Sequence, residues 1–435
     1  MPGVREKTLA PVSAGLTASL ERSAARPSKL DMRTPNDTPT STATAAPSHR
    51  LTALPTYVFA WLDELKEAAR SRGAVLIDLG IGNPDQPTPP AVVDAITKAY
   101  ADPRTHGYPP FRGTPQFLDA AAAFMKTRFG VTADPEREVV CVSGGKEGIA
   151  HLVMAFTDEE GVALVPDIHY PVHSRVAALV GGRVHLVPIR RDRGYLPNLE
   201  AIPSAIARKA RLLVLNYPHN PTGACAPVEF YQEAIAFCAR YGIVLVSDLA
   251  YSEITFDGYV APSVLELPGA ADVAVEFHSL SKSFNMAGSR VGFAVGNADL
   301  VDALYAVRTN MGYGTPAAIQ EGAAYALAHA AELTRPVARR YKERRDVVIE
   351  EFRSLGWDAA PTPATMFVWL PVPAGFDSQG WTRHLIDVAD VVVTPGNAFG
   401  PGGEGFFRVS LVAPPNVIRE ALARLRRAGV RFARS

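Results

Sequence analysis

The stretch "EFHSLSKSFNMAGSRVGF", residues 276–293, places a lysine among hydroxyl side chains directly after an apolar run. Ser279 and Ser281 precede Lys282, and Arg290 follows eight positions after that lysine. Taken one at a time, such residues are typical of a solvated loop. Whether they form a site depends on the strands and loops around them.

Short apolar runs alternate with helical stretches through the middle of the chain. The runs are "REVVCVSGG", "GVALVPD", "RLLVLNYPHN", "GIVLVSDLAY" and "VAVEFHSLSK". Runs of Val, Leu and Ile without polar alternation are typical of strands buried on both faces, and the helices between them indicate a mostly parallel α/β sheet. After about residue 330, a long charged helix, shorter strands and a final helix predict a smaller α+β domain.

We expect four segments along the chain. Residues 1–50 are rich in Ser, Thr, Ala and Pro without a hydrophobic period, and such a segment cannot bury enough apolar surface to offset its ordering entropy. They predict a disordered extension; an organellar address is the alternative, which the acidic residues in the segment disfavour. An N-terminal arm with part of the small domain (51–92), a large domain (93–330) and a small C-terminal domain (331–435) follow.

The overall composition excludes several classes of protein. Lys and Arg together number 44, as do Asp and Glu, so no net field favours nucleic acid or an anionic membrane as a partner. No apolar run approaches the length of a membrane helix. The three cysteines have no CxxC spacing, which suits a reducing cytoplasm and disfavours a disulfide scaffold or a zinc site.

Polar residues follow four of the apolar runs at the points where the strands end. They are Ser143-Gly144-Gly145-Lys146, Asn220, Asp248 with Tyr251, and Ser279 with Lys282. In an open parallel sheet these ends meet at one edge, so we expect the side chains to face one cavity. Each alone is explained by a turn, a helix cap or a solvated lysine. Together they match what pyridoxal 5′-phosphate (PLP) requires: a Schiff-base lysine, a carboxylate for the pyridine nitrogen and donors for the phosphate.

Four motifs carry a family resemblance from about residue 51 to the C-terminus. "NPTG", "SDLAY", "SLSKSFNMAGSRVG" and "FRVSL" resemble the signatures of class I/II aminotransferases, the fold type I PLP enzymes. Within that family, "THGYPPFRGTP" and "KEGIAHL" most resemble the alanine-forming glutamate–pyruvate transaminases of bacteria, whose relatives, the LL-diaminopimelate aminotransferases, share parts of the pattern. The resemblance implies ping-pong transfer of an amino group from an L-amino acid to a 2-oxo acid.

The resemblance also implies a role for each matching residue. Lys282 is implied as the catalytic Schiff-base lysine, Asp248 as the partner of the pyridine nitrogen, and Tyr251 as a partner of the ring's 3′ oxygen. The other implied cofactor contacts are Asn220 on the same oxygen, Tyr170 stacked on the ring, and Gly145, Lys146, Ser279 and Arg290 around the phosphate. The implied substrate contacts are Gly82, Asn220, Asn310 and Arg408, the last of which clamps the α-carboxylate.

Two of these matches imply a second subunit. Tyr108 resembles the tyrosine that reaches across a dimer interface to the neighbour's phosphate, and Asn310 resembles a residue lent in the same way, so a homodimer with shared sites is expected. His219, Ser289 and the stretch 310–316 depart from the family pattern, and we expect these changes to lie close to the substrate. They keep open a different PLP reaction, namely elimination, oxidation or carbon–carbon bond formation. A non-catalytic regulator is the third alternative, but such regulators usually carry an added DNA-binding module, and residues 1–50 show no helix-turn-helix pattern.

Overall fold

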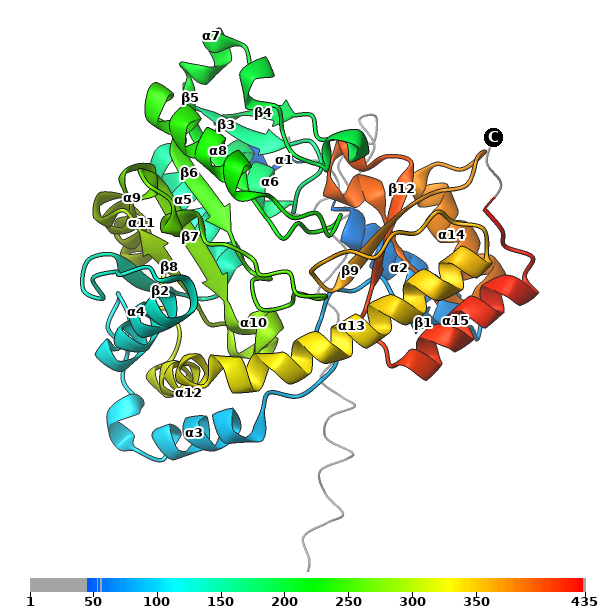
Figure 1. The fold of residues 1–435 in the computed structure, drawn as a ribbon, viewed down its shortest axis with the longest axis horizontal. Coiled ribbons are helices and arrows are strands. Elements are labelled where there is room, and N and C mark those ends of the chain that lie inside the picture. Colours follow the sequence, from blue (N-terminus) through cyan, green and yellow to red (C-terminus); the bar gives the residue numbers. More distant parts are fainter. Residues whose placement is uncertain (1–44, 53, 55–56, 433–435) are drawn as a thin grey trace, which may run out of the picture. The chain divides into compact units, whose positions relative to one another are not determined.

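A seven-stranded sheet with the order β2-β8-β7-β6-β5-β3-β4 forms the centre of the fold (Figure 1). The computed structural model describes residues 45–52, 54 and 57–432, so most of the predicted extension 1–50 lies outside the described residues. Helix α1 (His49–Thr52) begins within that predicted segment. The strands are β2 (Val139–Val142), β3 (Val162–Pro166), β4 (Arg183–Val187), β5 (Ala210–Leu215), β6 (Val244–Asp248), β7 (Ala274–Ser279) and β8 (Gly292–Gly296).

The sheet is mostly parallel, which confirms the predicted fold class. Strands β4, β3, β5, β6 and β7 pair in parallel, and β8 runs antiparallel to both of its neighbours, β7 and β2. Strand β2 therefore runs in the same direction as β7. The carboxyl ends of β2, β5, β6 and β7 consequently meet at one edge of the sheet, where ligands of open α/β sheets bind.

Helices cover both faces of this sheet, because successive strand residues point to opposite sides. In β2, Val140 and Val142 pack in one apolar cluster, whereas Val139 and Cys141 pack in another. The first face is covered by α5 (Gly145–Phe156), α6 (Val172–Leu179) and α11 (Ala298–Met311). The opposite face is covered by α3 (Pro90–Tyr100), α4 (Pro115–Phe129), α7 (Ser204–Ala207), α8 (Val228–Tyr241), α9 (Ala270–Val273) and α12 (Ala317–Ala328).

Two smaller sheets share a second core. One is antiparallel, in the order β11 (Thr394–Pro395), β12 (Phe406–Ser410) and β9 (Phe367–Pro371), and the other pairs β1 (Ile77–Asp78) with β10 (Val391–Val392) in parallel. Around them lie α2 (Val58–Ser71), α13 (Ala330–Ser354), α14 (Ser378–Ala389) and α15 (Pro415–Arg427). Figure 1 shows α13 running from α12 toward these sheets. The pairing of β1 with β10 brings the segment after residue 76 against the C-terminal part of the chain.

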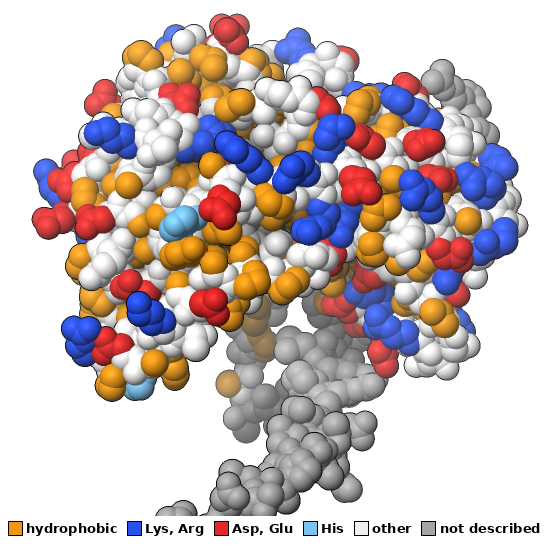
Figure 2. All heavy atoms as spheres, turned by 60° about the horizontal axis from the view of Figure 1, so that its bottom comes forward, with side chains coloured by type: hydrophobic (Ala, Val, Ile, Leu, Met, Phe, Trp, Pro, Cys, Tyr) orange, Lys and Arg blue, Asp and Glu red, His pale blue; other side chains and the backbone are white. Residues whose placement is uncertain are grey.

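Short helices occupy the connecting segments. These are α10 (Leu280–Ser283) and the 3₁₀ helices η1 (Pro103–Thr105), η2 (Arg191–Arg193), η3 (Leu199–Ala201), η4 (Val264–Glu266), η5 (Ala287–Ser289), η6 (Gly396–Phe399) and η7 (Pro401–Gly403). None of the described helices is long and apolar enough to cross a membrane. On the face shown in Figure 2, basic and acidic side chains are interspersed.

Candidate active site

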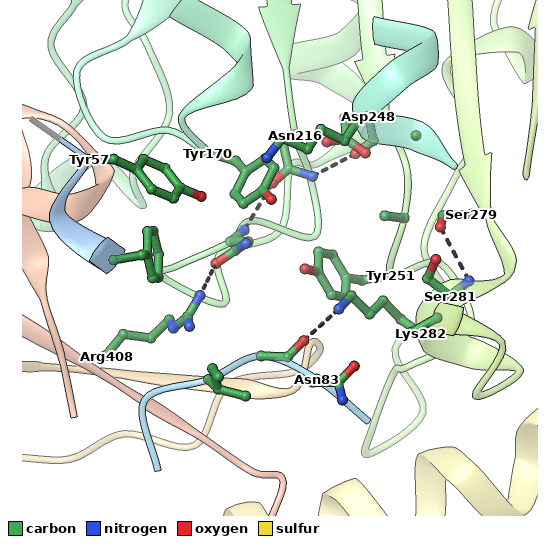
Figure 3. A pocket seen from close by; sticks show the side chains of 18 of the residues that line it. Tyr57, Asn83, Tyr170, Asn216, Asp248, Tyr251, Ser279, Ser281, Lys282 and Arg408 are labelled. Carbon is green, nitrogen blue, oxygen red and sulfur yellow. Dashed lines mark hydrogen bonds between the residues drawn. The ribbon is translucent and has the colours of Figure 1, made fainter. Parts of the chain in front are cut away.

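A cavity of about 520 Å³ opens at the carboxyl edge of the large sheet, beside β12 and the segment after β1. Except for Tyr108 and Asn310, every site residue predicted from the sequence lines this cavity. Figure 3 shows Lys282, Asp248, Tyr170, Tyr251 and Arg408 arranged around it. The prediction that the strand ends converge is therefore correct for the geometry of this chain.

Lys282 extends into the cavity from α10, the short helix that follows β7. Ser279 caps that helix, because its hydroxyl accepts a hydrogen bond from the Ser281 amide at 3.2 Å. The Lys282 Nζ donates to the Gly82 carbonyl at 2.5 Å (Figure 3). Burial lowers the pKa of Lys282 to about 8, and the positive charges of Arg408 and Arg290 act in the same direction. A lysine with this pKa has a substantial neutral fraction near neutrality and can act as a nucleophile.

Asp248 ends β6 and is held by residues behind it. His173, which is 1% exposed on α6, places its Nε2 at 3.0 Å from Asp248 Oδ2. Asn216 donates to the Asp248 backbone carbonyl at 2.6 Å and accepts from the Asn220 amide at 3.0 Å. This network fixes a carboxylate at the cavity wall, where it can accept a hydrogen bond from a protonated ring nitrogen.

Two tyrosines and an asparagine surround the middle of the cavity. Burial raises the pKa of Tyr170 to about 12, and burial also raises the pKa of Tyr251, so both phenols stay protonated. Asn220 accepts from the Arg408 guanidinium at 2.9 Å and interacts with the Tyr251 hydroxyl. Asn220 and Tyr251 therefore offer hydrogen-bond donors inside the cavity, and Tyr170 offers an aromatic ring as part of its wall.

The glycine turn after β2 forms an anion site together with Arg290. Gly144 has a φ of +90°, and a Cβ at this position would lie 2.5 Å from Arg290 Nη2, so the close approach requires glycine. Arg290 donates to the Ser143 carbonyl at 2.8 Å. Burial lowers the pKa of Lys146, as do the nearby positive charges of Arg290 and Arg175. Converging cations at the N-terminus of α5 favour a bound phosphate group.

Arg408 lies on β12 at the other end of the cavity and is 3% exposed. Its guanidinium donates to the Gly80 carbonyl at 2.6 Å, while its Nε has no hydrogen-bond partner among the described residues. Burial lowers its pKa to about 10. A Cβ on Gly82 would lie 3.0 Å from the Phe367 ring and 3.6 Å from Arg408 Nη2, so this glycine leaves room for the arginine. The arrangement suits bidentate binding of a carboxylate.

The donor set fits PLP. The anion site accounts for its phosphate, Asp248 for its pyridine nitrogen, and Lys282 for its aldehyde. Lys146 and Lys282 carry lowered pKa values because their positive charges are buried beside other cations, and a bound anion relieves that repulsion. No group of three or more His, Cys, Asp or Glu side chains within the described ranges could hold a metal ion.

Several predicted positions lie elsewhere. Tyr108 is 78% exposed and stacks on Tyr313 with ring centroids 3.9 Å apart, and Asn310 donates to the Ala306 carbonyl on its own helix. The expectation that His219 and Ser289 lie close to the substrate is not met within this chain, because neither side chain lines the cavity. His219 is buried and bonds the Thr222 hydroxyl and the Ile168 carbonyl.

The sequence interpretation missed a second group of residues. Tyr57, Asn83 and Asn216 line the cavity, and His173 lies behind Asp248. His173 follows Tyr170, the predicted ring-stacking residue, by three positions. Residues at this spacing lie on the same side of a helix, so the sequence spacing could have indicated His173. Asn216 directly follows β5, so the strand-end pattern that indicates Asp248 also indicates Asn216.

Comparison with known proteins defines the family. The family "Aminotransferase class I and II" matches residues 74–425. The chain is 44% identical over 385 residues to an LL-diaminopimelate aminotransferase 2 of Nostoc sp., covering 88% of this chain and 99% of the relative. It is 43% identical over 380 residues to the LL-diaminopimelate aminotransferase of Moorella thermoacetica, covering 87% and 97%.

Solved structures agree with this assignment. Apo-BacF from Bacillus subtilis superposes with a TM-score of 0.87 at 37% identity, covering 90% of this chain and all of that one. A probable N-succinyldiaminopimelate aminotransferase from Thermus thermophilus gives a TM-score of 0.80 at 38% identity, covering 85% and 100%. The chain belongs to the class I and II aminotransferases, the fold type I PLP enzymes. It is a PLP-dependent transaminase whose substrates are an amino acid and a 2-oxo acid.

Proposed function

We propose that this aminotransferase moves an amino group between a diamino dicarboxylic acid of the 2,6-diaminopimelate type and a 2-oxo acid such as 2-oxoglutarate. The observation that carries the proposal is the 43–44% identity, over nearly their full length, to enzymes named for LL-diaminopimelate. The resemblance to alanine-forming transaminases stays a prediction, with alanine as the competing amino donor.

Each cavity residue has a role in this proposal. When bound, PLP supplies an electron-accepting ring that delocalises the negative charge left on the substrate Cα after proton removal. Lys282 would hold the cofactor through its aldehyde and would carry the proton to and from Cα. Asp248 holds the pyridine nitrogen protonated, while Asn220 and Tyr251 donate to the 3′ oxygen.

The remaining cavity residues position the two ends of the reacting groups. Tyr170 stacks on the cofactor ring. Gly145, Lys146, Ser279 and Arg290 hold the phosphate. At the other end of the cavity Arg408 clamps the substrate α-carboxylate, with Gly82 beside it, and this clamp orients the Cα hydrogen toward Lys282.

Transamination has two halves, so single amino acids test the proposal. LL-2,6-diaminopimelate, L-glutamate and L-alanine are each mixed with the PLP-loaded enzyme, and the loss of visible absorbance and the released 2-oxo acid are measured. We expect diaminopimelate and glutamate to bleach the band stoichiometrically and 2-oxoglutarate to restore it. Diaminopimelate without effect, beside full bleaching by alanine, would reject the proposed substrate. A product other than a 2-oxo acid would favour the alternative PLP chemistries, for which the cavity-lining residues give no specific support.

We further propose a homodimer in which Tyr108 and Asn310 complete the partner's site. The exposure of Tyr108 and its stacking on Tyr313 support this, because a large aromatic pair is presented to solvent by a single chain. Mixing inactive Lys282→Ala and Tyr108→Ala chains tests it. Random reassociation should restore about a quarter of the wild-type activity, since hybrid dimers contain one intact site. No recovery after exchange of subunits would exclude the shared site.

The division into segments 51–92, 93–330 and 331–435 is also retained as a proposal, supported by the separate apolar cores of the large and small sheets. The proposed compartment is the cytoplasm. It is supported by three cysteines, Cys141, Cys225 and Cys238, that form no disulfide.

A further inference from the structure

One face of helix α2 forms a wall of the active-site cavity. Phe59, Leu62, Asp63 and Lys66 line the same cavity as Lys282 and Arg408. Their spacing of three and four residues places them on one side of the helix. Near its N-terminal end this wall is apolar, and one turn further along it carries one acidic and one basic side chain.

The charges in the cavity leave few groups for a substrate side chain. Its carboxylates are Asp63 and Asp248, and Asp248 is committed to His173 and the cofactor ring. Of its cations, Lys146 and Arg290 serve the phosphate, Lys282 the aldehyde, and Arg408 the α-carboxylate. Asp63 and Lys66 are the charged side chains of the cavity that the transamination chemistry does not use.

Asp63 and Lys66 differ in how firmly they are held. The Lys66 Nζ lies 2.6 Å from Asp63 Oδ1 and 3.2 Å from Asp78 Oδ2, and its side chain is 6% exposed. Asp78 is itself fixed, because it accepts from the Gly80 and Ile81 amides. The Asp63 side chain is 68% exposed. Burial alone would lower the pKa of Lys66, but its hydrogen bonds with Asp63 and Asp78 raise it overall, so the ammonium stays charged.

This asymmetry lets the pair open without leaving a buried charge unpaired. If Asp63 turns toward a ligand, Lys66 keeps Asp78 as its partner. An ammonium group entering the cavity then finds one free carboxylate, and a carboxylate entering with it finds the Lys66 ammonium. The pair is therefore complementary in charge to an amino acid head group: the Asp63 carboxylate faces its ammonium, and the Lys66 ammonium faces its carboxylate.

We propose that Asp63 and Lys66 form a second-head-group subsite, in which Asp63 binds the distal ammonium and Lys66 the distal carboxylate of a diamino dicarboxylic substrate. The inference rests on the proposed function for its substrate class. It goes beyond that function by assigning the discrimination between one and two amino groups to helix α2. A substrate with a single amino group leaves Asp63 paired with Lys66, so Asp63 does not contribute to the binding of that substrate.

The test compares two substrates that differ only in the distal amino group, 2,6-diaminopimelate and 2-aminopimelate. For the PLP-loaded enzyme, kcat/KM and the binding constant from the change in visible absorbance are measured for both. The wild type should prefer the diamino acid by about tenfold or more, as for a hydrogen bond to a charged group. In Asp63→Asn and Asp63→Ala this preference should fall to about one. Glu64→Gln, an exposed neighbour outside the cavity, is the matched control and should keep the preference.

The outcomes separate the inference from the proposed function. If Asp63→Asn keeps the wild-type preference, or lowers both substrates equally, Asp63 acts only through the local structure and the inference is wrong. If the wild type rejects diaminopimelate, the proposed substrate is wrong; L-lysine and L-norleucine, which differ in a terminal amino group, then serve as the pair. A lysine preference lost in Asp63→Asn supports the subsite, and the absence of any preference for lysine refutes it.

Discussion

Replacing Asp248 by alanine removes the carboxylate that we propose faces the cofactor ring nitrogen. The carboxylate is removed from a buried position, because the Asp248 side chain is 11% exposed and the His173 side chain behind it is 1% exposed. Water cannot readily take the place of the carboxylate at such depth. The positive charge on a protonated ring nitrogen would then have no partner. That positive charge is needed most when negative charge builds up on the substrate Cα.

The size of the effect follows from the burial. Removing one partner of a buried ion pair costs about 3–5 kcal/mol. If this free-energy cost falls on the transition state, the rate decreases by about two to four powers of ten. His173→Ala removes the supporting hydrogen bond at 3.0 Å, together with an edge contact to the Tyr170 ring, and leaves the Asp248 carboxylate in place. A hydrogen bond to a charged group contributes about 1.5–3 kcal/mol, which predicts a fall of about one to two powers of ten.

The assay is the single-turnover half-reaction with glutamate, followed by the visible absorbance of the loaded enzyme. We expect the order wild type, His173→Ala, Asp248→Ala from fastest to slowest, with Asp248→Glu milder than Asp248→Ala. The double variant should be no slower than Asp248→Ala, because His173 acts through that carboxylate. A near-normal rate in Asp248→Ala, or additive losses in the double variant, would refute the reasoning.

Three further changes have expected outcomes. Arg408→Lys should raise the KM of every amino donor by about tenfold or more while cofactor absorbance is retained, since a lysine cannot bind a carboxylate bidentately; an unchanged KM places the α-carboxylate elsewhere. Cofactor capture by the apoenzyme should speed up through about pH 8, because the neutral Lys282 amine is the nucleophile and its pKa lies near 8 instead of 10.5; a rise centred near pH 10 contradicts the lowered pKa. Gly144→Ala should weaken PLP binding, since its Cβ displaces the Arg290 guanidinium; unaltered PLP affinity argues against the anion site.

The sequence predicted the part of the site that strand ends provide. Asp248 and Lys282 follow buried apolar runs, and the direction of parallel strands forces such residues to one edge. Gly144 and Gly145 could be predicted because a glycine-rich strand-to-helix turn is a local feature of the sequence. The same reasoning applied to the end of β5 indicates Asn216 as well as Asn220.

The remainder depends on contacts that local sequence does not encode. Lys66 and Asp63 are three residues apart on a charged helix and are typical of a solvated surface. The pairing of β1 with β10, and the packing of α2 beside it, bury Lys66 against Asp78. Asp63 and Lys66 then line the cavity. Tyr108 needs a second subunit for its predicted role, because one chain leaves it exposed.

The most direct test of the central claim is the covalent position of the cofactor. The PLP-loaded enzyme is reduced with borohydride, digested, and the peptide containing residues 276–293 is sequenced by mass spectrometry. We predict a pyridoxyl group on Lys282 alone, and loss of both the label and turnover in Lys282→Ala. A label on Lys146 or another lysine, or a Lys282→Ala protein that keeps its visible band and its activity, would contradict the account.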